Sequence, residues 1–203
     1  MITIHNVDQV SEEWFKLREN KLTASHATAI GANGKGLETY CKNIVTEIVK
    51  LTPSEQYTNS DIERGNELEI LGLTSYEFET GLEVETVGFI TNDKYKNVGC
   101  SPDGLVGSDG GIEIKARNDE KHFSLIQGET KEIPFNQIQM CLLITERKWW
   151  DFVSINTNFD KSIFILRIYP DEKYFEKLKK GFDKGNEMIK KFHEKYINYK
   201  NKD

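Results

Sequence analysis

Residues able to hold a divalent cation and activate water lie close together near the middle of the chain. Asp103 is followed ten and twelve residues later by Glu113 and Lys115. Alternate side chains of a β-strand share a face, so Glu113 and Lys115 are expected to point the same way, while the isoleucines beside them face apolar packing. The sequence SDGG at 108–111 predicts a hairpin that returns the segment starting at Asp103 to this strand. We therefore expect two carboxylates and one ammonium group on one face at a sheet edge.

These residue types suit hydrolysis of a phosphodiester. Carboxylates are the ligands that Mg²⁺ prefers, and the ion retains water molecules in such sites. A nearby lysine can orient or deprotonate the attacking water and offset charge that builds on the phosphate. The arrangement is the pattern of PD-(D/E)xK phosphodiesterases. Because the same spacing also occurs in ordinary solvated hairpins, it does not identify a function alone.

The elements that must position these residues follow from spacing, capping and alternation. Helical periodicity passes to period-two alternation near residue 82 and returns near residue 134. The order indicates a mixed α/β fold with a central sheet flanked by helices, a restriction-endonuclease-like core. We expect helices at 11–18, 24–30 (capped by Thr23 and stopped by Gly31), 37–51, 61–80, 134–145 and 171–198, a flexible loop at 33–36, and strands at 82–90, 98–100, 104–106, 111–116, 149–155 and 162–169.

The length and composition are those of one globular domain, so we expect residues 1–203 to form a single domain, a nuclease domain if the motif above is functional. The chain has 203 residues, 37% hydrophobic and 30% charged, with no apolar stretch long enough to span a membrane and no signal-peptide pattern. Its three cysteines lie far apart, which excludes a disulfide framework and a four-cysteine metal or iron–sulfur site within one chain. The four histidines have no metal-binding spacing and are expected mainly at the surface.

Charge is distributed unevenly along the chain. The formal net charge of −6 disfavours a protein that merely coats DNA. Residues 171–203 carry ten lysines against seven acidic residues, so the remaining 170 residues have a net charge of −9. Such an acidic body can act on nucleic acid only if its carboxylates hold metal and its basic groups gather at phosphate.

Most of the chain resembles the phage lambda-type exonucleases of viral DNA recombination. The likeness is in order and is thin only at 31–60 and at the far C-terminus. It is carried by WFKLRENKLTAS (14–25), RGNELEILGLTSYEFETGLEV (64–84), CSPDGLVGSDGGIEIK (100–115), NQIQMCLLITERKWWDF (136–152) and YPDEKYFEKL (169–178).

The resemblance assigns catalytic and metal-binding roles. Glu69 matches a helix carboxylate near the metals, although a surface charge is a serious alternative because Glu67 is close by. Gln137 matches a glutamine beside the active site in preference to Gln139. The implied catalytic residues are Asp103, Glu113, Lys115 and Gln137, and the implied ligands of two Mg²⁺ ions, replaceable by Mn²⁺, are Asp103, Glu113, Glu69 and the backbone carbonyl of Ile114.

A second set of residues matches the family's 5′-phosphate pocket. Arg18, Ser25 and Ser101 fall at its contacts, and Lys121 stands where the family has an arginine. Free N–H groups at a helix start and a bidentate guanidinium both attract phosphate. Simple capping by Ser25 and a solvated helix face for Arg18 are the structural alternatives. Ile62 matches an apolar wedge that separates strands, with core packing equally open.

Family resemblance implies a Mg²⁺-dependent 5′-to-3′ exonuclease acting on the ends of double-stranded DNA. It would leave 3′ overhangs for a single-strand annealing protein, work as a ring-shaped homotrimer without membrane attachment, and act in the cytoplasm of a bacterial host of the phage or prophage. A PD-(D/E)xK endonuclease, restriction-like or structure-specific, is the alternative. A CRISPR-associated iron–sulfur nuclease is disfavoured by the cysteines, and a non-catalytic DNA-end binding module by the presence of Asp103, Glu113 and Lys115 together.

Overall fold

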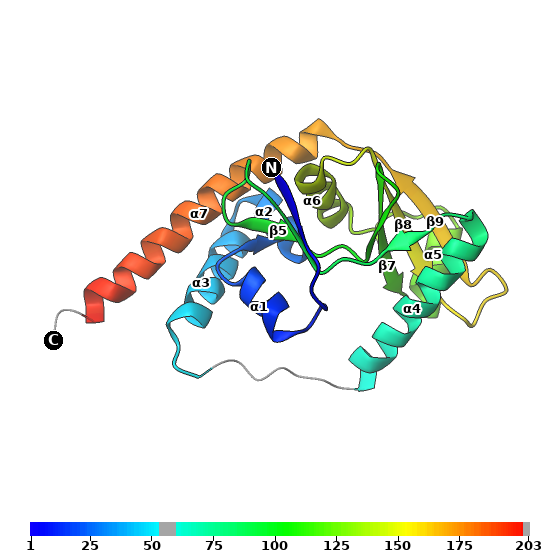
Figure 1. The fold of residues 1–203 in the computed structure, drawn as a ribbon, viewed down its shortest axis with the longest axis horizontal. Helices are drawn as coiled ribbons and strands as arrows, with labels where there is room; N and C mark the ends of the chain where they lie inside the picture. The colour runs from blue at the N-terminus through cyan, green and yellow to red at the C-terminus, as the bar shows by residue number, and fades with distance from the viewer. Residues whose placement is uncertain (53–59, 201–203) are drawn as a thin grey trace.

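The computed structural model describes residues 1–52 and 60–200, with the backbone alone for residues 60–66. Within these residues the strands form two sheets, and Figure 1 shows the helix α6 (Phe135–Thr145) between them. The mixed α/β architecture flanked by helices is confirmed, and its strands are shared between two sheets.

The first sheet is four-stranded, in the order β1-β4-β5-β2. Its neighbours are antiparallel except for β2 and β5, which pair in parallel. The strand nearest the N-terminus was not expected from the sequence. The strands are β1 (Ile2–His5), β2 (Leu22–Thr23), β4 (Phe89–Asn92) and β5 (Val98–Cys100).

The second sheet is five-stranded, in the order β3-β6-β7-β8-β9. β6 and β7 form the antiparallel hairpin predicted around 108–111, with Gly104 opposite Ile112. β7 pairs in parallel with β8 on its other side, so it is an interior strand, and the expectation that Glu113 and Lys115 lie at a sheet edge is wrong. The strands are β3 (Val84–Glu85), β6 (Gly104–Val106), β7 (Gly110–Ala116), β8 (Trp149–Ile155) and β9 (Ile163–Ile168).

The continuous strand expected at 82–90 is wrong. The chain forms β3 in the second sheet, breaks, and enters β4 in the first sheet. At the break Gly88 packs so closely on the N-terminal loop that a Cβ there would lie 2.2 Å from the carbonyl oxygen of Val7. This crossing brings the two sheets together beside Asp103.

The helices lie mainly where the sequence predicts them. Ser11 caps the first helix, its hydroxyl accepting from the Trp14 amide at 3.2 Å. The second helix differs, because Thr23 makes no capping bond and the helix passes through Gly31 to end at Asn33 in the left-handed conformation. The helices are α1 (Glu12–Arg18), a 3₁₀ turn (Ala24–His26), α2 (Ala27–Ala32), α3 (Lys35–Val49), α4 (Ser60–Thr80), α5 (Asp119–Ile126), α6 and α7 (Glu172–Lys200).

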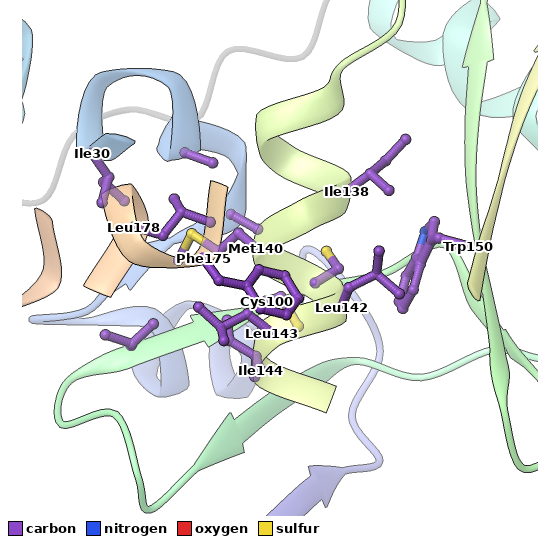
Figure 2. Packing of buried hydrophobic residues seen from close by; sticks show 14 of the residues in the cluster. Ile30, Cys100, Ile138, Met140, Leu142, Leu143, Ile144, Trp150, Phe175 and Leu178 are labelled. Carbon is purple, nitrogen blue, oxygen red and sulfur yellow. The ribbon is translucent and has the colours of Figure 1, made fainter. Parts of the chain in front are cut away.

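The core is built around α6, in which every residue from Ile138 to Thr145 is buried. Figure 2 shows Trp150 of β8 on one side of this helix and Leu178 of α7 on the other. A helix whose residues are buried on every side must be surrounded by other elements, and α6 contacts strands of both sheets as well as α7. It therefore fixes the two sheets and α7 relative to one another.

Helix α7 packs on α2, α3 and α6 through the buried residues Phe175, Leu178 and Phe182. The buried face of this part of α7 is therefore covered by the domain itself. No helix of the described residues is long and apolar enough to cross a membrane. The three cysteines of the chain are buried free thiols, as expected.

Candidate active site

The hairpin of β6 and β7 brings Asp103 to the side of β7. An oxygen of the Asp103 carboxylate accepts a 2.6 Å hydrogen bond from the backbone N–H of Ile114. On the same strand the Lys115 ammonium group lies 2.7 Å from the Glu113 carboxylate. Ile112 and Ile114 are buried among apolar side chains, as strand alternation requires. The expected group of two carboxylates and one ammonium is present.

Electrostatics in this group are dominated by burial. Glu113 is fully buried, and the loss of hydration, followed by repulsion from Asp103, raises its pKa to about 8. Burial also raises the pKa of Asp103, against the opposing effects of Lys115 and the Ile114 hydrogen bond. The pKa of Lys115 is raised by the surrounding carboxylates, which outweigh its own burial. The site thus has more carboxyl groups than its one lysine can neutralise, and burial favours their protonated forms as long as no cation is bound.

Two further elements reach the group. Glu69 comes from α4, and its pKa is raised by burial and by the negative charge of Asp103. Gln137 comes from α6 and donates a 2.5 Å hydrogen bond to Glu113. Gln139 lies elsewhere, where it donates to the Tyr169 carbonyl and accepts from the Asp171 amide.

The donor set fits a hard divalent cation. The Oε2 oxygen of Glu113 is buried and has no hydrogen-bond partner among the described residues, which leaves one acceptor beside Asp103 available to a ligand. Among the described residues no group of three or more His, Cys, Asp or Glu side chains is arranged to hold a metal ion. Mg²⁺ sites, however, commonly use one or two carboxylates, with water and substrate phosphate completing the shell. The roles of Asp103, Glu113, Glu69 and the Ile114 carbonyl as ligands remain predictions.

A second cluster forms around Ser101, two residues before Asp103. The Ser101 hydroxyl accepts from the Arg18 guanidinium at 3.1 Å and from the Trp14 indole N–H at 2.9 Å. The guanidinium carbon lies 4.0 Å from the Trp14 ring centroid, so the arginine is stacked as well as hydrogen bonded. Burial lowers the pKa of Arg18, and none of the carboxylates that the structure describes pairs with it. The Arg18 guanidinium is therefore a partly desolvated cation whose position is fixed by Ser101 and Trp14.

Ser25 adjoins this cluster from the 3₁₀ turn. Its hydroxyl lies 3.2 Å from Nδ1 of His26, whose ring stacks on Tyr40 with centroids 3.8 Å apart. The pKa of His26 is lowered by burial and then by the positive charge of Arg18, which places the histidine near the arginine. Thr23 lies opposite Gly99 in the pairing of β2 with β5, so the turn that carries Ser25 is near Ser101. Among the described residues the Ser25 hydroxyl contacts Thr23 and His26 and makes no contact with Arg18 or Ser101.

Two predicted residues stand apart. Lys121 lies on α5 and pairs with Glu132 at 3.3 Å, and none of its contacts joins it to the Ser101 cluster. The side chain of Ile62 lies outside the described residues.

The sequence interpretation missed several residues around these clusters. It gave Trp14 no role, although the indole holds both Ser101 and Arg18. It also missed Gln9, which donates to the Pro102 carbonyl at 2.9 Å. His122, to which the sequence interpretation gave no role, is fully buried and bonded to Ser154 at 2.8 Å. Of these residues only Trp14 could have been singled out from the sequence, because the indole N–H of a tryptophan in a partly buried helix needs a hydrogen-bond acceptor.

Comparisons with known proteins identify the family and support the fold. Residues 13–148 match the model of the YqaJ-like viral recombinase domain. Among solved structures, an alkaline exonuclease from Laribacter hongkongensis is 30% identical with a TM-score of 0.83, over 94% of this chain and 97% of that one; its complex with dAMP matches equally. A phage-related exonuclease from Haemophilus somnus 129PT shares the fold at 15% identity and a TM-score of 0.65, over 87% of this chain and 96% of that one. No curated protein matches. The chain belongs to the YqaJ-like viral recombinase domain family.

Proposed function

We propose that this protein is a Mg²⁺-dependent exonuclease that digests the 5′-ended strand of linear double-stranded DNA. One observation carries the proposal: the Arg18–Ser101 cluster is separated from Asp103 by Pro102 alone. A terminal phosphate bound by Arg18 and Ser101 would therefore lie one nucleotide from a phosphodiester bound at the carboxylates. Membership of a viral recombinase family and the likeness to an alkaline exonuclease support DNA exonuclease activity.

Each side chain of the site has a defined task in this proposal. Asp103, Glu113, Glu69 and the Ile114 carbonyl would hold the metal. A Mg²⁺ ion held there would supply a water of lowered pKa and would polarise the scissile phosphate. Lys115 orients the attacking water and offsets charge developing on the phosphate. The hydrogen bond from Gln137 fixes one oxygen of Glu113 and leaves the other for a ligand. The Ile114 amide holds the Asp103 carboxylate in the same way.

The proposal includes the biological setting that the family implies. Removal of one strand from its 5′ end leaves a 3′ overhang, which is the substrate of a single-strand annealing protein. We propose that three copies form a closed ring around the duplex and that the protein acts in the cytoplasm of a bacterial host. A solution mass near three times the 23.4 kDa chain mass is expected, and a concentration-independent monomer would remove the ring from the proposal.

Purified protein with Mg²⁺ and end-labelled DNA tests the activity. Linear duplex with a 5′-phosphate should be degraded faster than the same duplex with a 5′-hydroxyl, and a covalently closed circle should remain intact. Label at the 5′ end should appear first as mononucleotide. Cleavage of the closed circle would instead favour the PD-(D/E)xK endonuclease, which uses the same carboxylates without a terminal phosphate.

A further inference from the structure

The solvent-exposed face of α7 carries a row of lysines. Figure 1 shows this helix along one side of the molecule, with its C-terminal end projecting past α3. Residues three, four or seven positions apart lie on one side of an α-helix. The lysines at these spacings, which we call the lysine row, are all exposed and lie away from the buried face of α7: Lys173, Lys177, Lys180, Lys184, Lys191 and Lys195.

The charges of the lysine row are not balanced by carboxylates. Among residues 1–52 and 60–200, the one ion pair of α7 joins Lys190 to Glu194, and neither residue belongs to the row. Within the row Lys184 donates a hydrogen bond to the Asn33 carbonyl at 3.0 Å. Lys180 and Lys184 are four residues apart, and like charges at this spacing destabilise a helix. An anion bound along the row would remove this cost.

The lysine row is straight and regular. From Lys173 to Lys195 it extends about 33 Å at 1.5 Å per residue. One lysine stands at each turn, about 5.4 Å apart along the axis, except at the turn of Glu187. Successive phosphates of an extended nucleic-acid strand repeat at a similar interval, whereas the backbone of a duplex winds away from a straight line. The geometry therefore suits a single strand better than a duplex.

Aromatic side chains lie at the two ends of the lysine row. Tyr199 is four residues after Lys195 on the same face, and it is 75% exposed. At the other end the Tyr174 ring centroid lies 5.7 Å from Nζ of Lys177. A positively charged track with aromatic side chains on which bases can stack is typical of surfaces that bind single-stranded nucleic acid. The aromatic residues thus point to the same ligand as the spacing of the lysines.

The lysine row begins close to the candidate active site. Gln137 of α6 donates to Glu113, and two residues later Gln139 holds the start of α7 through the Tyr169 carbonyl and the Asp171 amide. Residues two positions apart point to opposite sides of a helix. The start of α7 and the carboxylates are therefore separated by α6, which is about 10–12 Å across. A few nucleotides of extended strand are long enough to cover that distance.

We infer that the lysine row binds the sugar-phosphate backbone of single-stranded DNA, the 3′-ended strand that remains after digestion. The inference rests on the proposed function, which supplies this strand. The lysines contact phosphates, and Tyr199 stacks on a base at the far end of the row. Phosphates and stacking surfaces are common to every nucleotide, so this binding does not depend on base sequence. The undigested strand stays attached to the protein while the site acts on its complement.

The salt dependence of binding tests the lysine row. Fluorescence anisotropy measures the affinity of the full chain for a single strand long enough to cover the row, at several KCl concentrations and in EDTA, which prevents metal-dependent cleavage. Each phosphate contact contributes about −0.7 to the slope of log K against log salt concentration for a single strand. Lys180→Gln combined with Lys191→Gln removes two contacts, so the slope should become shallower by about 1.4.

Lys179→Gln combined with Lys190→Gln is the matched control. Both positions are exposed and each adjoins one of the two substituted positions of the lysine row, so the net charge of α7 changes by the same amount. Each control lysine has an acidic residue three positions before it and another four positions after it. The slope of this variant should equal that of the wild type. Glutamine and lysine have similar helix propensities, so both variants should keep the thermal midpoint.

Two further comparisons identify the bound strand. With a blunt duplex of the same length, the Lys180 and Lys191 variant should change the slope by less than half as much as with the single strand, because a straight row follows a duplex backbone over a shorter distance. Tyr199→Ala should weaken single-strand binding at least about fivefold, whereas Tyr199→Phe, which keeps the ring, should retain it.

The outcomes distinguish this inference from the proposed function. Equal changes of slope in the row variant and its matched control would reduce the effect to net charge and overturn the lysine row as a site. Equal changes with the single strand and the duplex would overturn the assignment to single-stranded DNA. Failure of the wild type to cleave DNA with Mg²⁺ would overturn the proposed function, and that separate assay leaves the comparison of slopes valid.

Discussion

The hydroxyl of Tyr76 donates a 2.7 Å hydrogen bond to the carboxylate of Asp151, joining α4 to β8 with both side chains buried. Arg167 of β9 completes the group with two 2.8 Å bonds to the same carboxylate, and its guanidinium stacks on Trp149 at 3.6 Å. The pKa of Tyr76 is raised by burial and by Asp151, so the tyrosine remains a donor. Tyr76 is seven residues after Glu69, two helical turns along one face of α4. The buried bond thus helps to fix the helix that carries Glu69.

Tyr76→Phe should lower the free energy of unfolding by about 1.5–3 kcal/mol, because a hydrogen bond to a buried charge is lost. Asp151 keeps its bidentate pairing with Arg167, so the effect should stay at the lower end of that range. Urea denaturation measures it. Tyr199→Phe is the control, since Tyr199 is exposed at the end of α7 and its change should fall within about 0.5 kcal/mol of zero. Equal stability of both variants would contradict the anchoring role.

Gly72→Ala should impair the site even though alanine favours helix. A Cβ at position 72 would lie 2.8 Å from Cγ2 of Ile114, a stiff branched side chain between Glu113 and Lys115. The helix must move away from β7, which carries Glu69 away from Asp103. We expect at least about a tenfold loss of cleavage rate at limiting Mg²⁺, partly recovered at high Mg²⁺. At Gly36 of α3 the new Cβ meets only Ala29 at 3.5 Å, so Gly36→Ala should retain wild-type activity; equal loss in both variants would exclude the steric explanation.

Glu113→Gln should stabilise the metal-free protein while abolishing cleavage. The folded-state pKa of Glu113 is raised to about 8 from an ordinary value near 4.5. A carboxylate with a raised pKa destabilises the fold as pH rises through that window, since the folded state holds the proton longer than the unfolded state. The wild type in EDTA should therefore lose stability between about pH 4.5 and 8, and the variant should lose less. Thermal midpoints across this range, with and without Mg²⁺, measure both effects, and a variant less stable than wild type at pH 8 would contradict the electrostatic reading.

The chemistry-bearing hairpin could be predicted because its signals are local. Alternation over 111–116 set which side chains share a face, and SDGG set the turn, so the proximity of Asp103, Glu113 and Lys115 required no long-range knowledge. The break between β3 and β4 depends instead on the contact of Gly88 with Val7, 81 residues away in sequence. A contact between backbone segments so far apart produces no periodic pattern in the sequence, so the break could not be predicted from it.

The short helix α5 was missing from the sequence prediction for a related reason. Helix α5 has a cap, since the Asn118 side chain accepts from the Lys121 amide, but only His122 and Leu125 are buried. The bond from His122 to Ser154 of β8 stabilises this short helix from outside it. Without α5, alignment alone placed Lys121 at the phosphate pocket, whereas the helix directs it to Glu132.

Arg18 is the residue by which an exonuclease can be told from a general phosphodiesterase. A terminal phosphate carries more charge than an internal diester, and the Arg18 guanidinium is partly desolvated and hydrogen bonded to Ser101. Loss of one charge-assisted contact costs about 1.5–3 kcal/mol, or about tenfold to a hundredfold in rate. Arg18→Ala should slow degradation of 5′-phosphorylated ends by this factor and of 5′-hydroxyl ends little, so that the two rates converge.

Lys121→Ala is the matched control for this substitution. Like Arg18, Lys121 carries a positive charge and was assigned to the phosphate pocket by the family resemblance. Because Lys121 pairs with Glu132 in the structure, the preference for a 5′-phosphate should survive its removal. The ratio of the two rates is the informative quantity, because Arg18→Ala also removes packing against Trp14, and a general loss of stability slows both substrates alike and cancels in the ratio. Loss of the preference in Lys121→Ala, with retention in Arg18→Ala, would move the terminal-phosphate site from the end of α1 to α5. The one-residue spacing from Ser101 to Asp103 would then no longer define the length of the product.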